Sequence, residues 1–167
     1  MTALCLFLAV AAFFDYSKGK IPNPLLIIML LAGAGQSFGM GGAAGGGVFL
    51  AEVVMITALL YPLFMIGTVG AGDVKLLGIC AGYFPRDKIL YFLFFSMLWA
   101  AIFSLIKLWR MKNVKERLLY LGEYLMEVAQ TGKWRLYMEN ERERRTAGIC
   151  MSGPVLISAL LYMGGVY

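Results

Sequence analysis

The sequence predicts an all-α, polytopic membrane protein with about six transmembrane helices and its N-terminus outside. Of the 167 residues, 60% are hydrophobic and 15% are charged, whereas soluble domains are nearer half apolar and a quarter charged. The apolar residues form runs separated by short polar stretches, and a crossing helix needs roughly 20 of them to span about 30 Å of hydrocarbon. We therefore expect residues 1–167 to form one integral membrane domain in contact with the lipid bilayer.

The first apolar run extends from Met1 to Phe14 and is followed by Asp15, Lys18 and Lys20. As a helix it covers only about 21 Å, which is short for a crossing. No positive residue precedes it, so cleavage as a signal peptide is not expected. The positive charges behind it place its start outside and its end in the cytoplasm.

A turn at residues 21–24 leads into the second run, Leu25 to about Phe38. Asn23 is expected to cap this helix and Pro24 to occupy its first turn. The glycine-rich stretch 39–47 then predicts a flexible, uncharged outer connection. Phosphate binding by these glycines is disfavoured, because no Lys-Ser/Thr pair follows them.

The third run, about Val48 to Ile66, carries Glu52 near its outer end. We interpret Glu52 as a structural carboxylate, either paired or interfacial, in preference to a functional one. The fourth run begins at Asp73 and stops before Pro85, a natural helix breaker. As a helix it covers only about 18 Å.

A polar turn is predicted at residues 86–88, before a full-length fifth span from Ile89 to Trp109. The sixth span is Gly148 to Tyr167. Between them, residues 110–147 are polar and contain an amphipathic helical pattern. We expect a cytoplasmic helix there that lies on the membrane surface; packing against the rest of the protein is an equal alternative.

The distribution of basic residues supports this topology. The predicted outer loops contain only two positive residues, Arg86 and Lys88. The predicted inner loops contain the others, namely Lys18, Lys20, Lys75 and every Lys and Arg from Lys107 to Arg145. This asymmetry is the positive-inside pattern. The net charge of +5 therefore indicates loop charges beside a membrane, and no nucleic-acid partner is expected.

Histidine is absent, which excludes the Ser/His/Asp triad, the usual Cys/His pair and His-containing zinc sites. Cys5, Cys80 and Cys150 are far apart in apolar runs, so they are interpreted as buried hydrophobic residues. Neither a metal nor a cofactor is expected. Carboxylates remain the main candidates for chemistry.

Two of these carboxylates are predicted to lie on the same side of the membrane at similar depth. Asp15 ends a short helix and Asp73 opens another, and both charges lie beside hydrocarbon, where charged residues usually serve a function. Two adjacent carboxylates in a low-dielectric site tend to share one proton. One can then activate water while the other protonates an amide, which would hydrolyse a peptide bond. Gly70 and Gly72 permit an unusual turn and close approach of a substrate backbone.

Each of these features also has a purely structural interpretation. Asp15 is alternatively an interfacial acid paired with Lys18. Asp73 is alternatively the N-cap of its helix, and Gly70 and Gly72 are alternatively helix-packing residues. The shared side and depth of the two aspartates favour the functional interpretation.

The residues Gly70-Ala71-Gly72-Asp73-Val74-Lys75 resemble the GxGD motif of intramembrane aspartyl proteases, in the GxGDxK form of type IV prepilin peptidases. Asp15, followed by Lys20-Ile21-Pro22-Asn23, resembles the second signature of that family, and the six-span layout extends the resemblance over the whole chain. The resemblance implies an aspartyl endopeptidase that removes the short basic leader of prepilins or pseudopilins at the cytoplasmic face of the bacterial plasma membrane.

By the same resemblance, Asp15 and Asp73 are the catalytic pair. Gly70, Gly72 and Asn23 shape the site with Lys75 as a supporting residue, and pilus assembly proteins are further partners. The chain lacks the CxxC pairs of the methylating domain in bifunctional members, so it resembles the protease-only branch of the tight-adherence or Flp type. Archaeal preflagellin peptidases share the motif and remain an alternative. Presenilin-type proteins do not match, because they pair GxGD with Tyr-Asp and Pro-Ala-Leu motifs.

A hypothesis from another class is a non-catalytic membrane scaffold, or a small ion- or proton-coupled transporter that uses the same aspartates. A transporter would more naturally contain paired repeats with two broken helices in corresponding positions. The sequence contains no such repeats.

Overall fold

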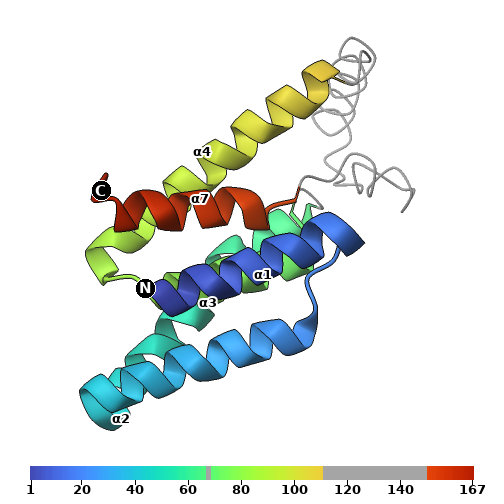
Figure 1. Cartoon of the computed structure of the whole chain (residues 1–167). Coiled ribbons are helices and arrows are strands. Elements are labelled where there is room, and N and C mark those ends of the chain that lie inside the picture. The colour runs from blue at the N-terminus through green and yellow to red at the C-terminus, as the bar shows by residue number, and fades with distance from the viewer. Residues whose placement is uncertain (67–68, 111–149) are drawn as a thin grey trace, which may run out of the picture.

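The computed structural model describes residues 1–66, 69–110 and 150–167, and these residues form helices and no strands. The helices are α1 Thr2–Lys18, α2 Asn23–Met65, α3 Ala71–Ala81, α4 Arg86–Arg110 and α7 Ser152–Met163 (Figure 1). The predicted all-α class is therefore confirmed. The predicted cytoplasmic helix in 110–147 lies, apart from residue 110, outside the described residues.

Two of the described helices, α2 and α4, are long and apolar enough to cross a membrane. Large apolar side chains are exposed on the outside of several helices, among them Leu6, Phe13, Leu31 and Phe94. So many exposed large apolar side chains are unusual for a soluble protein and are what lipid contact requires. The helices thus indicate a membrane protein, while six crossings and the outside N-terminus remain predictions.

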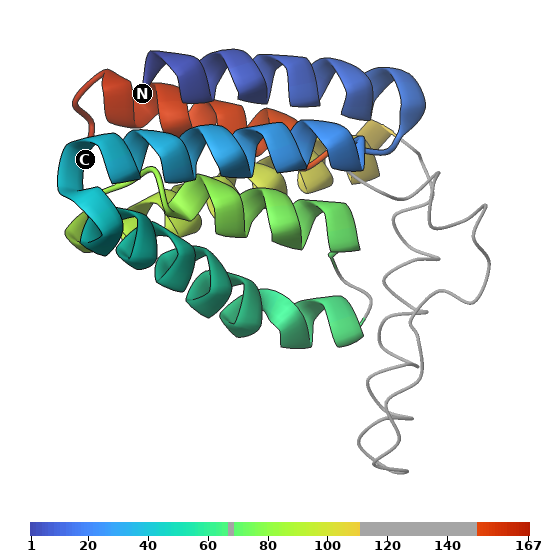
Figure 2. The same cartoon turned by 90° about the horizontal axis from the view of Figure 1, so that it is seen from below.

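Helix α2 consists of two arms that fold back on each other at Gly42 (Figure 2). Gly42 has φ 61° and ψ −153°, a combination that is essentially restricted to glycine. The residues on both sides of it are helical, so the predicted flexible connection over residues 39–47 is wrong. One glycine makes the reversal, and its neighbours continue the helices.

Three other predicted boundaries are also corrected. Pro22 is the N-cap of α2, so Asn23 is its first residue and makes no side-chain capping bond. Helix α4 begins at Arg86, directly after Pro85, so the predicted turn at 86–88 is the first turn of a helix. Helix α7 covers only Ser152–Met163, which is shorter than the predicted sixth span.

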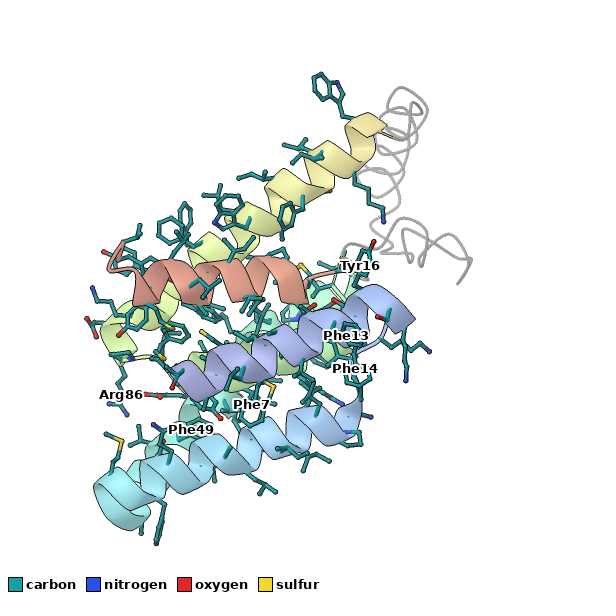
Figure 3. All side chains as sticks on the ribbon, in the orientation of Figure 1. Phe7, Phe13, Phe14, Tyr16, Phe49 and Arg86 are labelled. Carbon is teal, nitrogen blue, oxygen red and sulfur yellow. The ribbon has the colours of Figure 1, made fainter. Side chains whose placement is uncertain are left out.

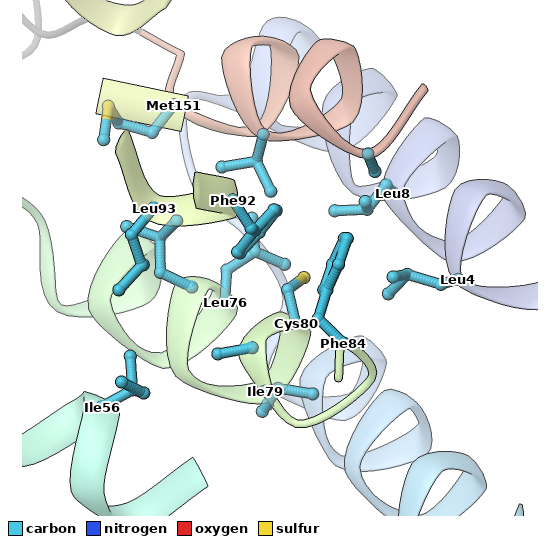
Figure 4. Packing of buried hydrophobic residues seen from close by; sticks show 14 of the residues in the cluster. Leu4, Leu8, Ile56, Leu76, Ile79, Cys80, Phe84, Phe92, Leu93 and Met151 are labelled. Carbon is cyan, nitrogen blue, oxygen red and sulfur yellow. The ribbon is translucent and has the colours of Figure 1, made fainter. Parts of the chain in front are cut away.

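Helix α3 lies inside the bundle and is buried along most of its length. It packs mainly against α2, while α7 packs against both α1 and α4. Leu76, Leu77 and Cys80 of α3 are fully buried, in a cluster that includes Leu4 and Leu8 of α1, Phe92 of α4 and Met151 before α7 (Figure 4). The core therefore joins segments from both ends of the chain.

Close approach of α2 and α3 depends on a glycine outside the GxGD motif. A Cβ atom added to Gly78 would collide with Thr57 and lie 3.2 Å from the backbone oxygen of Val53. Small residues allow helix backbones to approach in this way. The helix-packing role considered for the motif glycines thus belongs, on α3, to Gly78.

Glu52 is paired, as one of its two structural interpretations requires. Its buried carboxylate accepts a hydrogen bond from Arg86 Nε at 2.8 Å, which ties α2 to the first turn of α4. Arg86 lies at the opposite end of the bundle from Tyr16 (Figure 3), the residue that follows Asp15. Glu52 and Asp15 therefore occupy opposite ends of the molecule.

Candidate active site

Asp15 lies in the last turn of α1 with only 8% of its surface exposed. Its Oδ2 atom accepts a hydrogen bond from Ser152 Oγ at 2.6 Å and a longer one from the Ser152 N–H at 3.4 Å. Ser152 is the first residue of α7 and is itself fully buried. A buried carboxylate is tolerated when it is hydrogen-bonded in this way, so α7 provides the environment that Asp15 needs.

The alternative pairing of Asp15 with Lys18 is not present. The Lys18 ammonium group lies 5.1 Å from the centre of the Phe14 ring, where it can make a cation–π contact. Asp15 points instead into the bundle toward Ser152.

Asp73 is the third residue of α3 and its N-cap is Gly70. The Asp73 N–H donates to the Gly70 carbonyl oxygen at 3.1 Å, and the Asp73 carboxylate in turn accepts a hydrogen bond from the Gly70 backbone. This reciprocal arrangement resembles a capping box with glycine in the N-cap position. The alternative in which Asp73 is itself the N-cap is therefore wrong.

The two aspartates lie close enough to interact electrostatically, and both act on the same third group. The Cys150 thiol donates to the backbone oxygen of Asp15 at 3.7 Å. Burial raises the pKa of this thiol, the negative charges of Asp15 and Asp73 raise it further, and Lys107 of α4 lowers it. The structure therefore brings Asp15, Asp73, Cys150 and Lys107 to one end of the bundle.

This end is assembled from four separate parts of the chain. The end of α1, the end of α4 and the start of α7 lie on the same side of the molecule in Figure 1, and the start of α3 joins them in Figure 2. Alternating helix directions produce the arrangement, because α1 and α4 run toward this end while α3 and α7 run away from it. The site consequently unites residues more than 130 positions apart in sequence.

The two motif glycines have different surroundings. A Cβ atom on Gly70 would lie 2.9 Å from Asp73 Oδ2, closer than van der Waals contact allows. A Cβ atom on Gly72 would approach nothing nearer than Ile21 Cβ at 3.9 Å. Gly70 therefore makes room for the Asp73 carboxylate, whereas Gly72 leaves open space beside the site.

The remaining predicted site residues are peripheral. The side chains of Lys75 and Asn23 are exposed, and within the described ranges no hydrogen bond or ion pair joins either of them to an aspartate. In the same ranges, no three His, Cys, Asp or Glu side chains are grouped closely enough to hold a metal ion. The functional groups gathered at this end include the two carboxyls, the Ser152 hydroxyl and the Cys150 thiol.

Ser152 is the site residue that sequence reasoning missed. Its partner Asp15 is 137 positions away. A serine at the start of a helix ordinarily indicates a local cap. No local sequence pattern distinguishes a serine that caps its own helix from one that hydrogen-bonds to a residue of another helix.

A comparison with protein-family models places this site in a known context. The model described as the type IV leader peptidase family matches residues 2–105, well over half of the chain, and the matched region contains both Asp15 and Asp73. The chain therefore belongs to the type IV leader peptidase family, as the two sequence signatures predicted. Searches of curated proteins and of solved structures found no match.

Family membership supports a leader-peptidase-like function in general terms. The match ends within α4, so Ser152 and the rest of α7 lie beyond it. The contact between α7 and Asp15 is consequently a feature that the structure adds to the family assignment.

Proposed function

We propose that this protein is an aspartyl endopeptidase that cleaves the short basic leader peptide of Flp-like type IV prepilins or pseudopilins. Asp15 and Asp73 form its catalytic pair, and the active site faces the cytoplasm from the inner membrane of a bacterium. The observation that carries the proposal is that these two carboxyls lie close enough to interact electrostatically at one end of a bundle that belongs to the leader peptidase family.

The chemistry requires a single water molecule and no covalent intermediate. One carboxylate removes a proton from water, and the water oxygen bonds to the carbonyl carbon of the scissile peptide. The other carboxyl group donates its proton to the carbonyl oxygen, which gives a tetrahedral diol. When the C–N bond breaks, a proton passes to the leaving nitrogen and the carboxyl pair returns to its starting state.

Two features support the cytoplasmic orientation. Lys18 and Lys20 follow Asp15 directly, and Lys107 near the site adds a further positive charge at this end. The opposite end, which carries Arg86, has fewer basic residues. This asymmetry agrees with the positive-inside rule, and no methylating activity is proposed, because the chain contains no CxxC pair.

The test is cleavage of a prepilin by the purified protein in detergent or lipid nanodiscs. Asp15→Asn and Asp73→Asn are each expected to abolish formation of the shortened pilin while leaving membrane insertion unchanged. Glu52→Gln is the matched control, because Glu52 is an equally buried carboxylate at the opposite end of the bundle. It should retain cleavage.

Normal processing by both aspartate variants would overturn the catalytic pair. If the wild-type protein cleaved no leader-bearing substrate, and ion flux through proteoliposomes depended on Asp15 and Asp73, the transporter hypothesis would replace the peptidase. Substrate added outside sealed vesicles should be cleaved when the vesicles are inverted, with the cytoplasmic face outward, and not when they are right-side-out. This result would establish the orientation.

A further inference from the structure

We infer that Ser152 is a positioning residue for Asp15, and that its hydroxyl assigns the role of general base to Asp15 and that of proton-bearing acid to Asp73. This inference rests on the proposed function, since it divides the work between the two members of the catalytic pair. It also gives α7, which lies outside the region matched by the family model, a part in the reaction.

The hydrogen bond between Ser152 and Asp15 has the geometry of a donor bound to a charged carboxylate. Ser152 Oγ is 2.6 Å from Asp15 Oδ2, a separation typical of a hydroxyl that donates to an ionised carboxylate. The Ser152 N–H approaches the same oxygen at 3.4 Å. Both donors act on Oδ2 and hold the carboxylate in one orientation, so the inference places the attacking water at Oδ1.

Ser152 is the first residue of α7, and Met151 is the N-cap of this helix. The first turn of a helix presents unpaired N–H groups and a partial positive charge. A negative charge is stabilised there, and Asp15 of α1 reaches that position through the Ser152 contact. The Ser152 hydroxyl and the start of α7 thus both stabilise a negative charge on Asp15.

Asp73 and Asp15 receive hydrogen bonds from different kinds of donors. The hydrogen bond that its carboxylate receives comes from the backbone of Gly70 in its own helix turn, whereas Asp15 receives a hydroxyl and an N–H from another helix. Because two adjacent carboxylates do not both ionise cheaply, the proton belongs on the one with fewer donors. A protonated Asp73 can donate to the substrate carbonyl oxygen.

The other titratable groups at this end do not change the assignment. Besides Asp73 of α3, Asp15 faces the thiol of Cys150, which precedes α7, and this thiol is neutral because its pKa is raised. Lys107 of α4 is a cation at the same end, and the Lys18 ammonium group on the helix of Asp15 lies over Phe14. Ser152 Oγ is the donor that contacts Oδ2 at 2.6 Å.

The experiment compares Ser152→Ala, Ser152→Thr and Ser158→Ala with the wild-type protein in the prepilin cleavage assay. Ser158 is the matched control, because it is a fully buried, hydrogen-bonded serine on the same helix, away from the aspartates. Ser152→Ala should lower kcat by about ten- to a hundredfold with KM little changed, as expected for loss of a hydrogen bond to a charged group.

The pH profile provides the readout that a purely structural role would not alter. Ser152→Ala removes the donor that contacts Asp15 Oδ2 at 2.6 Å, so the acidic limb of kcat/KM, which reports the general base, should move to higher pH. The basic limb, which reports the proton on Asp73, should remain in place. Ser152→Thr keeps the hydroxyl and should restore the position of the acidic limb.

Ser158→Ala is expected to keep the wild-type pH profile even if it unfolds at a lower temperature. The inference would be overturned if Ser152→Ala had the same kcat and the same acidic limb as the wild-type protein. It would also be overturned if kcat fell while the acidic limb stayed in place. Either result, combined with inactive Asp15→Asn and Asp73→Asn variants, would leave the proposed peptidase intact. Active aspartate variants would instead overturn the proposed function itself.

Discussion

Gly70 and Asp73 support each other at the start of α3. The Asp73 N–H donates to the Gly70 carbonyl oxygen at 3.1 Å, and a Cβ atom on Gly70 would lie only 2.9 Å from Asp73 Oδ2. The carboxylate therefore occupies the space that a side chain at position 70 would fill. This explains physically why glycine precedes the aspartate by three residues.

Gly70→Ala should reduce prepilin cleavage strongly, because the added methyl group displaces the Asp73 carboxylate. A misplacement of about 1 Å can lower kcat roughly a hundredfold. Gly72→Ala is the matched control, since its Cβ would meet only Ile21 at an ordinary contact distance of 3.9 Å. Equal activity losses in the two variants, measured as kcat at saturating substrate, would contradict the steric role of Gly70.

Cys150 should report the charges of Asp15 and Asp73. The pKa of its thiol is raised by burial and by the nearby carboxylates, so at neutral pH little thiolate forms and alkylation should be slow. Removing a negative neighbour lowers that pKa and increases the thiolate fraction. Asp15→Asn should therefore accelerate alkylation.

The measurement is the alkylation rate against pH in a protein that carries Cys5→Ser and Cys80→Ala, so that Cys150 is the only thiol. Asp73→Asn should accelerate the reaction less than Asp15→Asn, because Asp73 raises the pKa of this thiol less than Asp15 does. A larger effect of Asp73→Asn would contradict this order.

Arg86→Met should destabilise the protein without altering its chemistry. It leaves the buried Glu52 carboxylate without the hydrogen bond that Arg86 Nε provides, and an unsatisfied buried group costs about 1–3 kcal/mol. The thermal unfolding midpoint in detergent should fall, while cleavage at a permissive temperature persists.

Lys88→Met is the matched control for Arg86→Met. It removes a positive charge from the same turn of α4, but the Lys88 ammonium group lies over the Tyr91 ring at 5.6 Å. Its unfolding midpoint should stay near that of the wild-type protein. Equal losses in the two variants would indicate that net charge, and not the ion pair, stabilises this end.

Replacing two buried serines of α4 and α7 by alanine should change the stability of the protein in different ways. Ser158 Oγ donates to the Phe92 carbonyl oxygen at 3.0 Å, whereas Ser96 Oγ is buried with no hydrogen-bond partner among the described residues. Ser158→Ala should therefore cost about 1 kcal/mol of stability. Ser96→Ala should be neutral or stabilising, because an unpaired hydroxyl is unfavourable when buried.

Thermal unfolding of both variants in the same detergent tests this contrast. A destabilised Ser96→Ala would show that its hydroxyl has a partner. An unchanged Ser158→Ala would show that its hydrogen bond contributes little to the packing of α7 on α4.

The helical class, the apolar runs and the family could be predicted because they depend on local sequence. A run of apolar residues bounded by charges is readable without coordinates, and the two aspartate signatures are short contiguous motifs. The predictions failed where the local sequence is compatible with two kinds of secondary structure. Glycine-rich residues 39–47 were predicted to form a loop, yet all of them except Gly42 are helical.

The sequence by itself singled out Asp15 and Asp73, since they stand out as charges beside hydrocarbon in a chain without histidine. Only the tertiary structure decided what surrounds them. Ser152 reaches Asp15 because α1 and α7 run in opposite directions side by side, and no local pattern encodes a contact across 137 positions. The orientation of a carboxylate is a property of the helices packed around it.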